Sequence, residues 1–269
     1  MTAIAFDHVA CDFVTPDGGN YRAVHDVSFA AAPGAFVAIV GPSGCGKSTL
    51  LNAAAGLRAP SAGAVTIDGT PLDGLNRRAT YMFQQDALLP WKNVRDNVSL
   101  GLVLAGATRA EAGRRADEWL ARVGLSTFSS HYPSQLSGGM RKRVAMAQNW
   151  VLDRPVVLMD EPFSALDVHT RQRMETELLS LWDEGPARRT VLFVTHDLEE
   201  AIALADEVVV LSAGPASRVV ARYPVPIERP RDLMELRTTP AFIELYKATW
   251  SVLREEVIKS QRGDASRAR

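Results

Sequence analysis

The hydrophobic pattern of the first third of the chain predicts mostly strands. Residues 2–32 alternate between apolar and polar positions on either side of a turn-rich stretch at 15–20, which indicates two or three short strands. Residues 35–40 form a continuous apolar and β-branched run typical of a buried strand, and residues 48–55 are rich in helix-forming residues. Further strands are predicted at 64–70 and 79–83. We therefore expect two antiparallel pieces on either side of a parallel core.

The pattern becomes helical between about residues 88 and 154. Apolar residues recur at helical spacing over 93–98, 109–123 and 138–151, and Ser137 stands where it can cap the third of these helices. We expect this region to form a helical subdomain inserted into the sheet domain.

Strands and helices alternate again after the helical insert. Residues 156–160 are apolar up to a closing acid, which suits a central parallel strand buried on both faces. The remaining predicted elements are a helix at 168–184, a strand at 190–195, a helix from 198, and strands at 207–211 and 218–223. Together they predict an α/β domain with a mixed central sheet over residues 2–223. Residues 224–260 indicate a stiff linker and an amphipathic helix, and residues 261–269 indicate a disordered tail.

Composition and charge argue against a nucleic-acid partner, a membrane-spanning segment and secretion. The 269 residues are 46% hydrophobic and carry a formal net charge of −1 at pH 7, which gives no basic surface for nucleic acid. The longest apolar runs fall far short of the roughly 20 residues that span a bilayer. The N-terminal residues lack the pattern of a secretory signal, and Cys11 and Cys45 provide no disulfide framework. These features indicate a cytosolic, reducing compartment.

A glycine-rich loop provides the first candidate chemistry. Residues 41–49 match the phosphate-loop pattern G-x-x-x-x-G-K-[ST] between a predicted strand and a predicted helix. Glycines allow consecutive N–H groups to point at an anion, and the helix N-terminus adds its positive dipole end. Lys47 would reach the β- and γ-phosphates, and Ser48 would bind a Mg²⁺ ion. The candidate nucleotide-binding residues of the loop are Gly41, Pro42, Ser43, Gly44, Cys45, Gly46, Lys47, Ser48 and Thr49.

Three further stretches distinguish among the phosphate-loop protein classes. The stretch Leu-Ser-Gly-Gly-Met at 136–140 puts a glycine pair at a predicted helix N-terminus, which is a second anion-binding end. The strand ending in Asp160 and Glu161 offers one acid for a Mg²⁺ shell and another that could polarise a water molecule. Ser-Ala-Leu-Asp follows at 164–167, and His196 comes directly after the next predicted strand.

This order of motifs closely resembles the ATP-binding cassette (ABC) ATPases, a group of P-loop NTPases, across about residues 2–223. The resemblance implies a head-to-tail dimer of two copies, in which each ATP lies between the phosphate loop of one chain and the signature stretch, 136–140, of the other. It implies that Glu161 is the general base and that His196 holds the γ-phosphate and the attacking water, alongside Lys47. Gln84 and Asp160 would complete the Mg²⁺ shell with Ser48.

The resemblance also implies which residues act across the dimer interface and which residue stacks on the adenine ring of ATP. Ser137, Gly138 and Gly139 would contact the ATP of the opposite chain, and Asp167 would act across the interface. Phe13 stands at the point where the family places an aromatic residue on adenine, with Tyr21 as the alternative. Gln85 is the alternative to Gln84. Met140 replaces the glutamine that usually ends the signature stretch, which removes a polar contact.

The residues from 83 to 98 resemble the ATPases of nitrate, sulfonate and taurine importers. This implies a transmembrane permease as partner, a solute-binding protein acting indirectly, and a peripheral position on the cytoplasmic face of the inner membrane. Trp91 is a candidate contact with the permease; the alternative is that it only packs the junction between the sheet domain and the helical subdomain. Two alternatives are an exporter ATPase and a soluble ABC-type ATPase acting on nucleic acid or ribosomes, but the near-neutral charge disfavours nucleic acid. The candidate permease contacts are Leu88, Leu89, Pro90 and Trp91.

Overall fold

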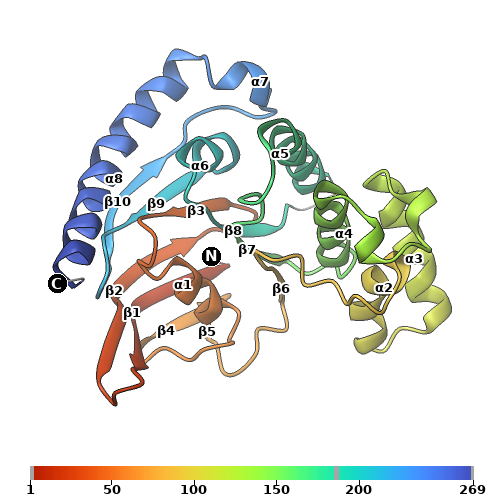
Figure 1. The fold of residues 1–269 in the computed structure, drawn as a ribbon, viewed down its shortest axis with the longest axis horizontal. Coiled ribbons are helices and arrows are strands. Elements are labelled where there is room, and N and C mark those ends of the chain that lie inside the picture. The colour runs from red at the N-terminus through yellow and green to blue at the C-terminus, as the bar shows by residue number, and fades with distance from the viewer. Residues whose placement is uncertain (1–2, 185–187, 268–269) are drawn as a thin grey trace.

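The computed structural model describes residues 3–184 and 188–267 (Figure 1). Four of its strands form an antiparallel sheet in the order β2-β1-β4-β5. A turn with positive φ at Asp68 and Gly69 joins β4 to β5, as expected for an Asp-Gly hairpin. The bounds of these strands are β1 (Ile4–Val14), β2 (Asn20–Ala31), β4 (Ala62–Ile67) and β5 (Thr70–Pro71).

The second sheet has six strands in the order β10-β9-β3-β8-β7-β6. All neighbouring strands are parallel except β10 and β9. The expectation of two antiparallel pieces around the core is therefore wrong, because the early strands share one sheet and β6 joins the parallel one. Its strands are β3 (Phe36–Val40), β6 (Ala79–Met82), β7 (Val156–Asp160), β8 (Thr190–Val194), β9 (Glu207–Leu211) and β10 (Val219–Pro224).

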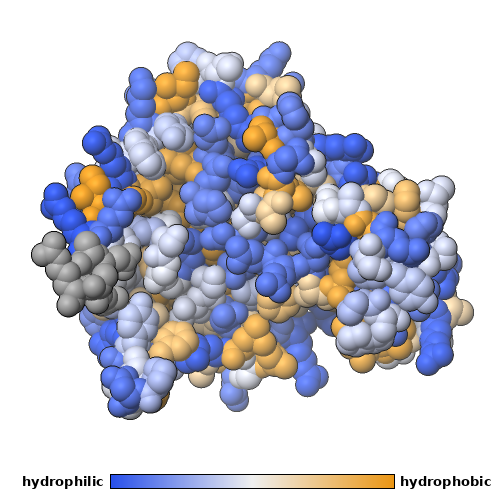
Figure 2. Space-filling model, in the orientation of Figure 1, coloured by the Kyte–Doolittle hydropathy of each residue, from blue (hydrophilic) through white to orange (hydrophobic). Residues whose placement is uncertain are grey.

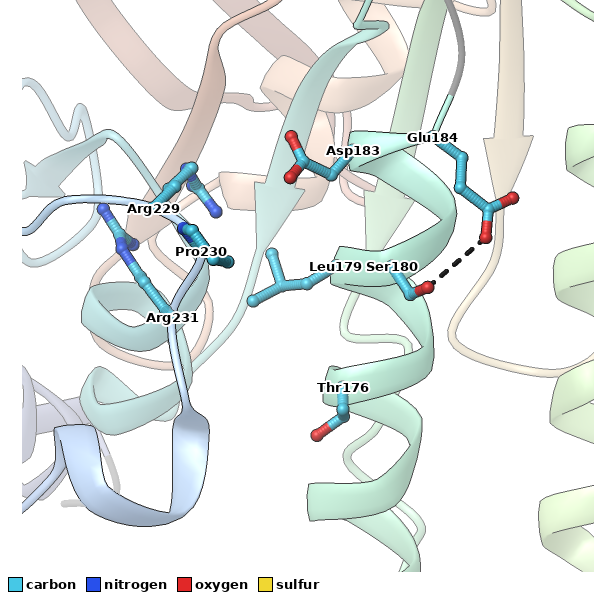
Figure 3. A pocket seen from close by; sticks show the side chains of 8 residues that line it. All are labelled: Thr176, Leu179, Ser180, Asp183, Glu184, Arg229, Pro230 and Arg231. Carbon is cyan, nitrogen blue, oxygen red and sulfur yellow. Dashed lines mark hydrogen bonds between the residues drawn. The ribbon is translucent and has the colours of Figure 1, made fainter.

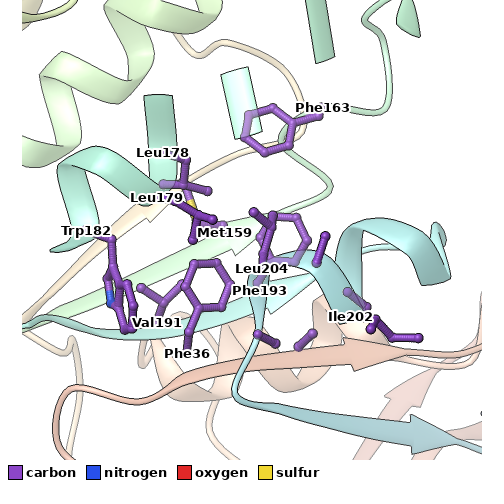
Figure 4. Packing of buried hydrophobic residues seen from close by; sticks show 14 of the residues in the cluster. Phe36, Met159, Phe163, Leu178, Leu179, Trp182, Val191, Phe193, Ile202 and Leu204 are labelled. Atoms are coloured by element: carbon purple, nitrogen blue, oxygen red, sulfur yellow. The ribbon is translucent and has the colours of Figure 1, made fainter. Parts of the chain in front are cut away.

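The alternation of side chains along β3 divides the protein interior into two cores. Phe36, Ala38 and Val40 face helices α5 (Val168–Asp183) and α6 (Leu198–Leu204), as Figure 4 shows for part of this cluster. Val37 and Ile39 face the antiparallel sheet and α1 (Lys47–Ala54). Since both faces of β3 are covered, the apolar run over residues 35–40 is explained by burial alone.

Three helices form an arm with its own core on one side of the molecule (Figure 1). They are α2 (Val94–Leu104), α3 (Arg109–Arg122) and α4 (Gly138–Trp150). Short 3-10 helices, η1 (Ser126–Phe128) and η2 (Pro133–Gln135), join α3 to α4. Because α4 also contributes Trp150 to the core under the parallel sheet, the arm is anchored to the sheet domain through this helix.

The C-terminal part consists of α7 (Leu233–Leu236) and the long helix α8 (Pro240–Arg267), which packs on α6, β9 and β10. The expected disordered tail at 261–269 differs from the structure, where α8 continues to Arg267. The arginine and alanine residues in this stretch favour helix, and the single glycine there does not end it; residues 268–269 lie outside the described part.

The surface shows no broad apolar face in the view of Figure 2. Hydrophilic residues cover most of that face, and hydrophobic residues form small, separate patches. Among the helices of residues 3–184 and 188–267, none has the length and apolarity needed to cross a bilayer.

Candidate active site

The phosphate loop connects the end of β3 to the start of α1 in a backbone conformation that requires glycine. Gly44 and Gly46 have φ angles of +73° and +92°, and Gly46 caps α1. A Cβ atom on Gly46 would lie 2.5 Å from Cγ1 of Val24. The loop can therefore keep this shape only with glycine at position 46.

Lys47 is held inside this loop rather than extended into solvent. Its side chain is buried, and Nζ donates hydrogen bonds to the carbonyl oxygens of Gly41 at 2.9 Å and Pro42 at 3.0 Å. An ammonium group has three donors, so these two bonds leave one for a further acceptor. Cys45 is also buried, and burial raises the pKa of its thiol.

Asp160 lies at the end of β7, directly against the start of α1. Ser48 Oγ donates to Asp160 Oδ1 at 2.9 Å, and the Tyr81 hydroxyl donates to Oδ2 at 3.3 Å. Burial raises the pKa of Asp160, although both hydrogen bonds act in the opposite direction. Burial also raises the pKa of Tyr81, which keeps its hydroxyl a donor. The sequence analysis missed Tyr81; its position three residues before Gln84 was the available signal.

Glu161 meets His196 and Gln84 where three parallel strands end. His196 Nδ1 lies 2.9 Å from Glu161 Oε2, and Gln84 Nε2 lies 3.5 Å from the same oxygen and 3.5 Å from Ser164 Oγ. Glu161 has a φ of +43°, a left-handed conformation that is uncommon for a non-glycine residue and clusters at functional sites. The carboxyl edge of a parallel sheet is the expected place for such a group.

A cleft of about 620 Å³ joins the phosphate loop to Glu161 and Gln84. Phe13 and Tyr21 are partners across β1 and β2 and both line it, so either can stack on a planar ligand. The Arg58 guanidinium lies 3.9 Å from the Phe13 ring centroid, which leaves the opposite ring face for a ligand. The lining consists of Phe13, Val14, Thr15, Pro16, Tyr21, Ala23, Ser43, Gly44, Gly46, Lys47, Ser48, Thr49, Gln84 and Glu161.

The signature stretch lies outside this cleft, at the N-terminus of α4. Ser137 is exposed, and its Oγ accepts a hydrogen bond from the N–H of Met140 at 3.3 Å. A Cβ on Gly139 would lie 2.8 Å from Cγ2 of Thr170, so α4 begins close to the start of α5. Asp167 is exposed there and caps α5 by accepting from the N–H of Thr170 at 3.0 Å. The structure thus groups the signature stretch with Asp167 and not with its own phosphate loop.

An ion-pair cluster that the sequence analysis missed connects α4 to the segment after Gln84. Lys142 is buried, and its Nζ donates to the carbonyl oxygen of Gln84 at 3.1 Å and lies 2.9 Å from Asp86 Oδ1. Arg141 Nε donates to Asp86 Oδ2 at 3.2 Å. The basic run after the signature stretch was visible in the sequence, but its acidic partner is separated from it by more than 50 residues.

A second pocket, of about 400 Å³, lies between α5 and the linker and contains none of the predicted site residues (Figure 3). Its two arginines have partners within the protein. Arg229 Nη2 lies 2.8 Å from Asp206 Oδ1, and Arg231 Nη1 donates to carbonyl oxygens at the end of α6, including that of Ala205 at 2.8 Å. Burial lowers the pKa of Arg231 to about 10. We interpret this pocket as the place where the linker closes the C-terminus of α6.

The chain matches the ABC transporter family over residues 24–164. It belongs to that family. It is 42% identical over 251 residues to the taurine import ATP-binding protein TauB of Rhizobium johnstonii, covering 92% of this chain and 95% of the relative. It is 40% identical over 242 residues to the nitrate import ATP-binding protein NrtD of Synechococcus elongatus, covering 89% of this chain and 87% of that protein.

A solved structure supports the same assignment. The dimeric, post-hydrolysis structure of the ATP-binding cassette MJ0796 bound to ADP and Pi has a TM-score of 0.72 to this chain at 31% identity. The similarity covers 84% of this chain and 100% of that chain. The predicted fold class and the assignment as an ABC transporter ATPase are therefore confirmed.

Proposed function

We propose that this ABC ATPase hydrolyses ATP to drive uptake of a small organic or inorganic anion, of the nitrate, sulfonate or taurine kind, through a separate permease. The observation that carries the proposal is the contact of 2.9 Å between Glu161 and His196, because Glu161 also lines the cleft of the phosphate loop. The taurine and nitrate import functions named for two relatives support this class of solute.

The chemistry of hydrolysis follows from the side chains around the cleft. Phosphoryl transfer depends mainly on positioning and on neutralising charge, which the phosphate-loop amides and Lys47 supply. Glu161 accepts a proton from the attacking water, and His196 and Gln84 hold that carboxylate and the water in place. This arrangement assigns Glu161, His196, Lys47 and Gln84 to catalysis.

Mg²⁺ fits the oxygen donors beside the phosphate loop. Ser48 Oγ and the Asp160 carboxylate are already paired at 2.9 Å, and both are the hard oxygen ligands that this ion prefers. No group of three His, Cys, Asp or Glu side chains suited to a metal occurs in the described part of the chain, which agrees with an ion held largely by water and phosphate. The ion would neutralise phosphate charge, with Gln84 as a third protein ligand.

A second copy of the chain would complete the nucleotide site. Ser137, Gly138 and Gly139 lie at a helix N-terminus, which is suited to an anion, outside their own cleft, and the exposed Asp167 lies close to them. A head-to-tail dimer would place these residues over the ATP of the opposite chain. The dimer of the related cassette supports this arrangement.

The permease would dock between the parallel sheet and the helical arm. A groove of about 340 Å³ lies there, lined in part by Phe83, Ala87 and Leu104. Leu104 and Trp91 are 79% and 71% exposed, which leaves both available to a partner. Leu88 packs against the core of the arm. This docking places the chain on the cytoplasmic face of the inner membrane, with a solute-binding protein on the other side.

The proposal is tested by purifying the subunit from detergent-solubilised membranes and reconstituting it. We expect an integral membrane protein to co-purify, and we expect ATP-dependent uptake of labelled taurine or nitrate into proteoliposomes that hold the solute-binding protein. The Glu161→Gln variant is the matched control without hydrolysis. Recovery of nucleic acid in place of a membrane protein would refute the transporter function, and transport of solute only in the opposite direction would indicate an exporter.

A further inference from the structure

Arg171, in the first turn of α5, has a side chain that contacts the two loops on either side of the reaction centre. Its Nη1 donates to Asp197 Oδ2 at 2.9 Å, and its Nη2 donates to the carbonyl oxygen of Leu166 at 3.3 Å. Asp197 directly follows His196, and Leu166 directly precedes Asp167. One planar guanidinium group therefore bridges the loop that carries His196 and the loop that carries Asp167.

Apart from the bond from Arg171, the contact of His196 with Glu161 and the bond from the N–H of Thr195 to the carbonyl oxygen of Ile39 at 3.3 Å, the bonds of the His196 loop come from its own neighbours. Thr195 Oγ1 donates to Glu200 Oε2 at 2.6 Å and accepts from the N–H of Asp197 at 3.0 Å. Asp197 Oδ1 accepts from the N–H of Glu199 at 2.9 Å, which caps α6. These bonds join β8 to α6, whereas the bond from Arg171 comes from α5. The contact therefore connects the His196 loop to a separate element.

The contact is protected enough to transmit a displacement. The side chains of Arg171 and Asp197 are 24% and 30% exposed, and Arg171 Nε lies 3.6 Å from Glu200 Oε1, whose carboxylate is buried. A charge-assisted bond of this kind is stronger and more directional than one between exposed side chains. If the Leu166–Asp167 segment moves, the carbonyl oxygen bound to Arg171 moves with it.

We propose that Arg171 is a positioning residue that couples the two ATP sites of the dimer. The inference rests on the proposed function, in which His196 acts in its own site and Asp167 acts across the interface. Closure of the opposite site displaces the Asp167 loop, and Arg171 transmits this displacement to His196. Hydrolysis at the two sites is then cooperative, and it loses its cooperativity when the guanidinium fork is removed.

Two other arginines make it possible to separate coupling from helix anchoring. Arg237 Nη2 lies 2.7 Å from Glu175 Oε2, so this buried pair anchors α5 to the segment after α7. Arg173 makes an exposed pair with Glu177 on the same helix, at 3.1 Å. Neither pair includes Leu166 or Asp197. Arg237→Met thus tests anchoring of α5, and Arg173→Met tests the loss of a charge from that helix.

The experiment measures ATPase rate against ATP concentration, ATP binding to the monomer, and Tm for the full-length protein and these variants. We expect Arg171→Met to lower kcat by about tenfold or more, since misplacing groups near the reacting atoms can cost about a hundredfold. Its Hill coefficient should fall to about 1 from a wild-type value between 1 and 2, while ATP affinity of the monomer stays within about twofold. Arg171→Lys, which keeps the charge without the fork, should be intermediate.

Arg237→Met should lower Tm but keep kcat within about twofold, and it should keep the wild-type Hill coefficient. A wild-type Hill coefficient of about 1 would overturn the inference, as would Arg171→Met losing no more activity than Arg237→Met. These outcomes differ from failure of the proposed function, in which the wild type lacks ATPase activity or Glu161→Gln retains it.

Discussion

The phosphate loop and the signature stretch are both glycine-containing helix N-termini, but the fold treats them differently. At the phosphate loop, Lys47 is buried against its own loop carbonyls and Ser48 is paired with Asp160. At the signature stretch, Ser137 and Gly138 are exposed and lie outside the cleft. The first is preorganised within one chain, and the second is an exposed helix N-terminus outside the cleft, as expected for a surface that meets another molecule.

The difference shows how one chain can regulate its own reaction. In the proposed dimer, the preorganised phosphate loop binds nucleotide within one chain, and hydrolysis requires groups that the second copy supplies. The ion pairs of Asp86 with Arg141 and Lys142 connect α4, which follows the signature stretch, to the segment after Gln84, a residue that lines the cleft of the phosphate loop.

Replacement of Glu161 by glutamine should leave a site that binds ATP but hydrolyses it very slowly. We expect turnover to fall by at least about a hundredfold, because the general base is lost while the amide keeps the shape of the side chain. ATP should remain bound and hold a dimer that is visible by size-exclusion chromatography. Turnover at the wild-type rate would remove Glu161 as the base.

Ser137→Arg should block the signature stretch while leaving the phosphate loop intact. We expect hydrolysis to be abolished and ATP binding to the isolated monomer to stay within about twofold, because Ser137 is exposed and outside the cleft. The matched control is Ser134→Arg, which places the same charge on an exposed serine of η2. If the monomer loses ATP binding, the site is not completed by a second chain.

Gly46→Ala tests whether the phosphate loop depends on its strained backbone. The added Cβ would meet Val24 at a φ of +92°, so we expect weaker ATP binding and a loss of about 1–3 kcal/mol of stability, measured by urea denaturation. Gly44→Ala is the matched control, since its φ is also positive but its Cβ would enter open space. If both variants lose the same stability and ATP affinity, the effect comes from the positive φ and not from the contact with Val24.

Glu200, beside the His196 loop, should make stability depend on pH. Burial raises the pKa of Glu200 to about 7 from its ordinary value of 4.5. The folded state then binds more protons than the unfolded state between these values, so this group lowers stability as pH rises from about 4.5 to 7. Glu200→Gln removes this titrating carboxyl group. We expect the substitution to shift Tm upward, relative to the wild type, by a few degrees more at pH 7.5 than at pH 5. A difference that is independent of pH would contradict this explanation.

Trp91→Ala should have the smallest effect on the isolated subunit. Because Trp91 is 71% exposed, we expect Tm to change by about 1 °C or less and basal ATPase activity to be unchanged. Recovery of the permease with the purified subunit should nevertheless fall. A large loss of Tm would return Trp91 to the role of packing the subdomain junction.

Local chemistry made much of the fold predictable. The strand-loop-helix unit around Gly46 and Lys47 was recognisable because its glycine spacing, apolar strand and helix formers are adjacent in sequence. The N-cap Ser137 was readable for the same reason. The pairing of β6 was predicted wrongly, because strand pairing is a long-range choice that local signals do not determine.

The sequence by itself determined the parts of this protein whose chemistry is carried by neighbouring residues: the phosphate loop, the signature stretch and the acids that end β7. Only the tertiary structure decided which distant side chains meet. It brings Ser48 to Asp160 across 112 positions, His196 to Glu161 across 35, and Arg171 to Asp197 across 26. The physical reason is that helix and loop propensities act over a few residues, whereas these contacts depend on the order of strands in the parallel sheet.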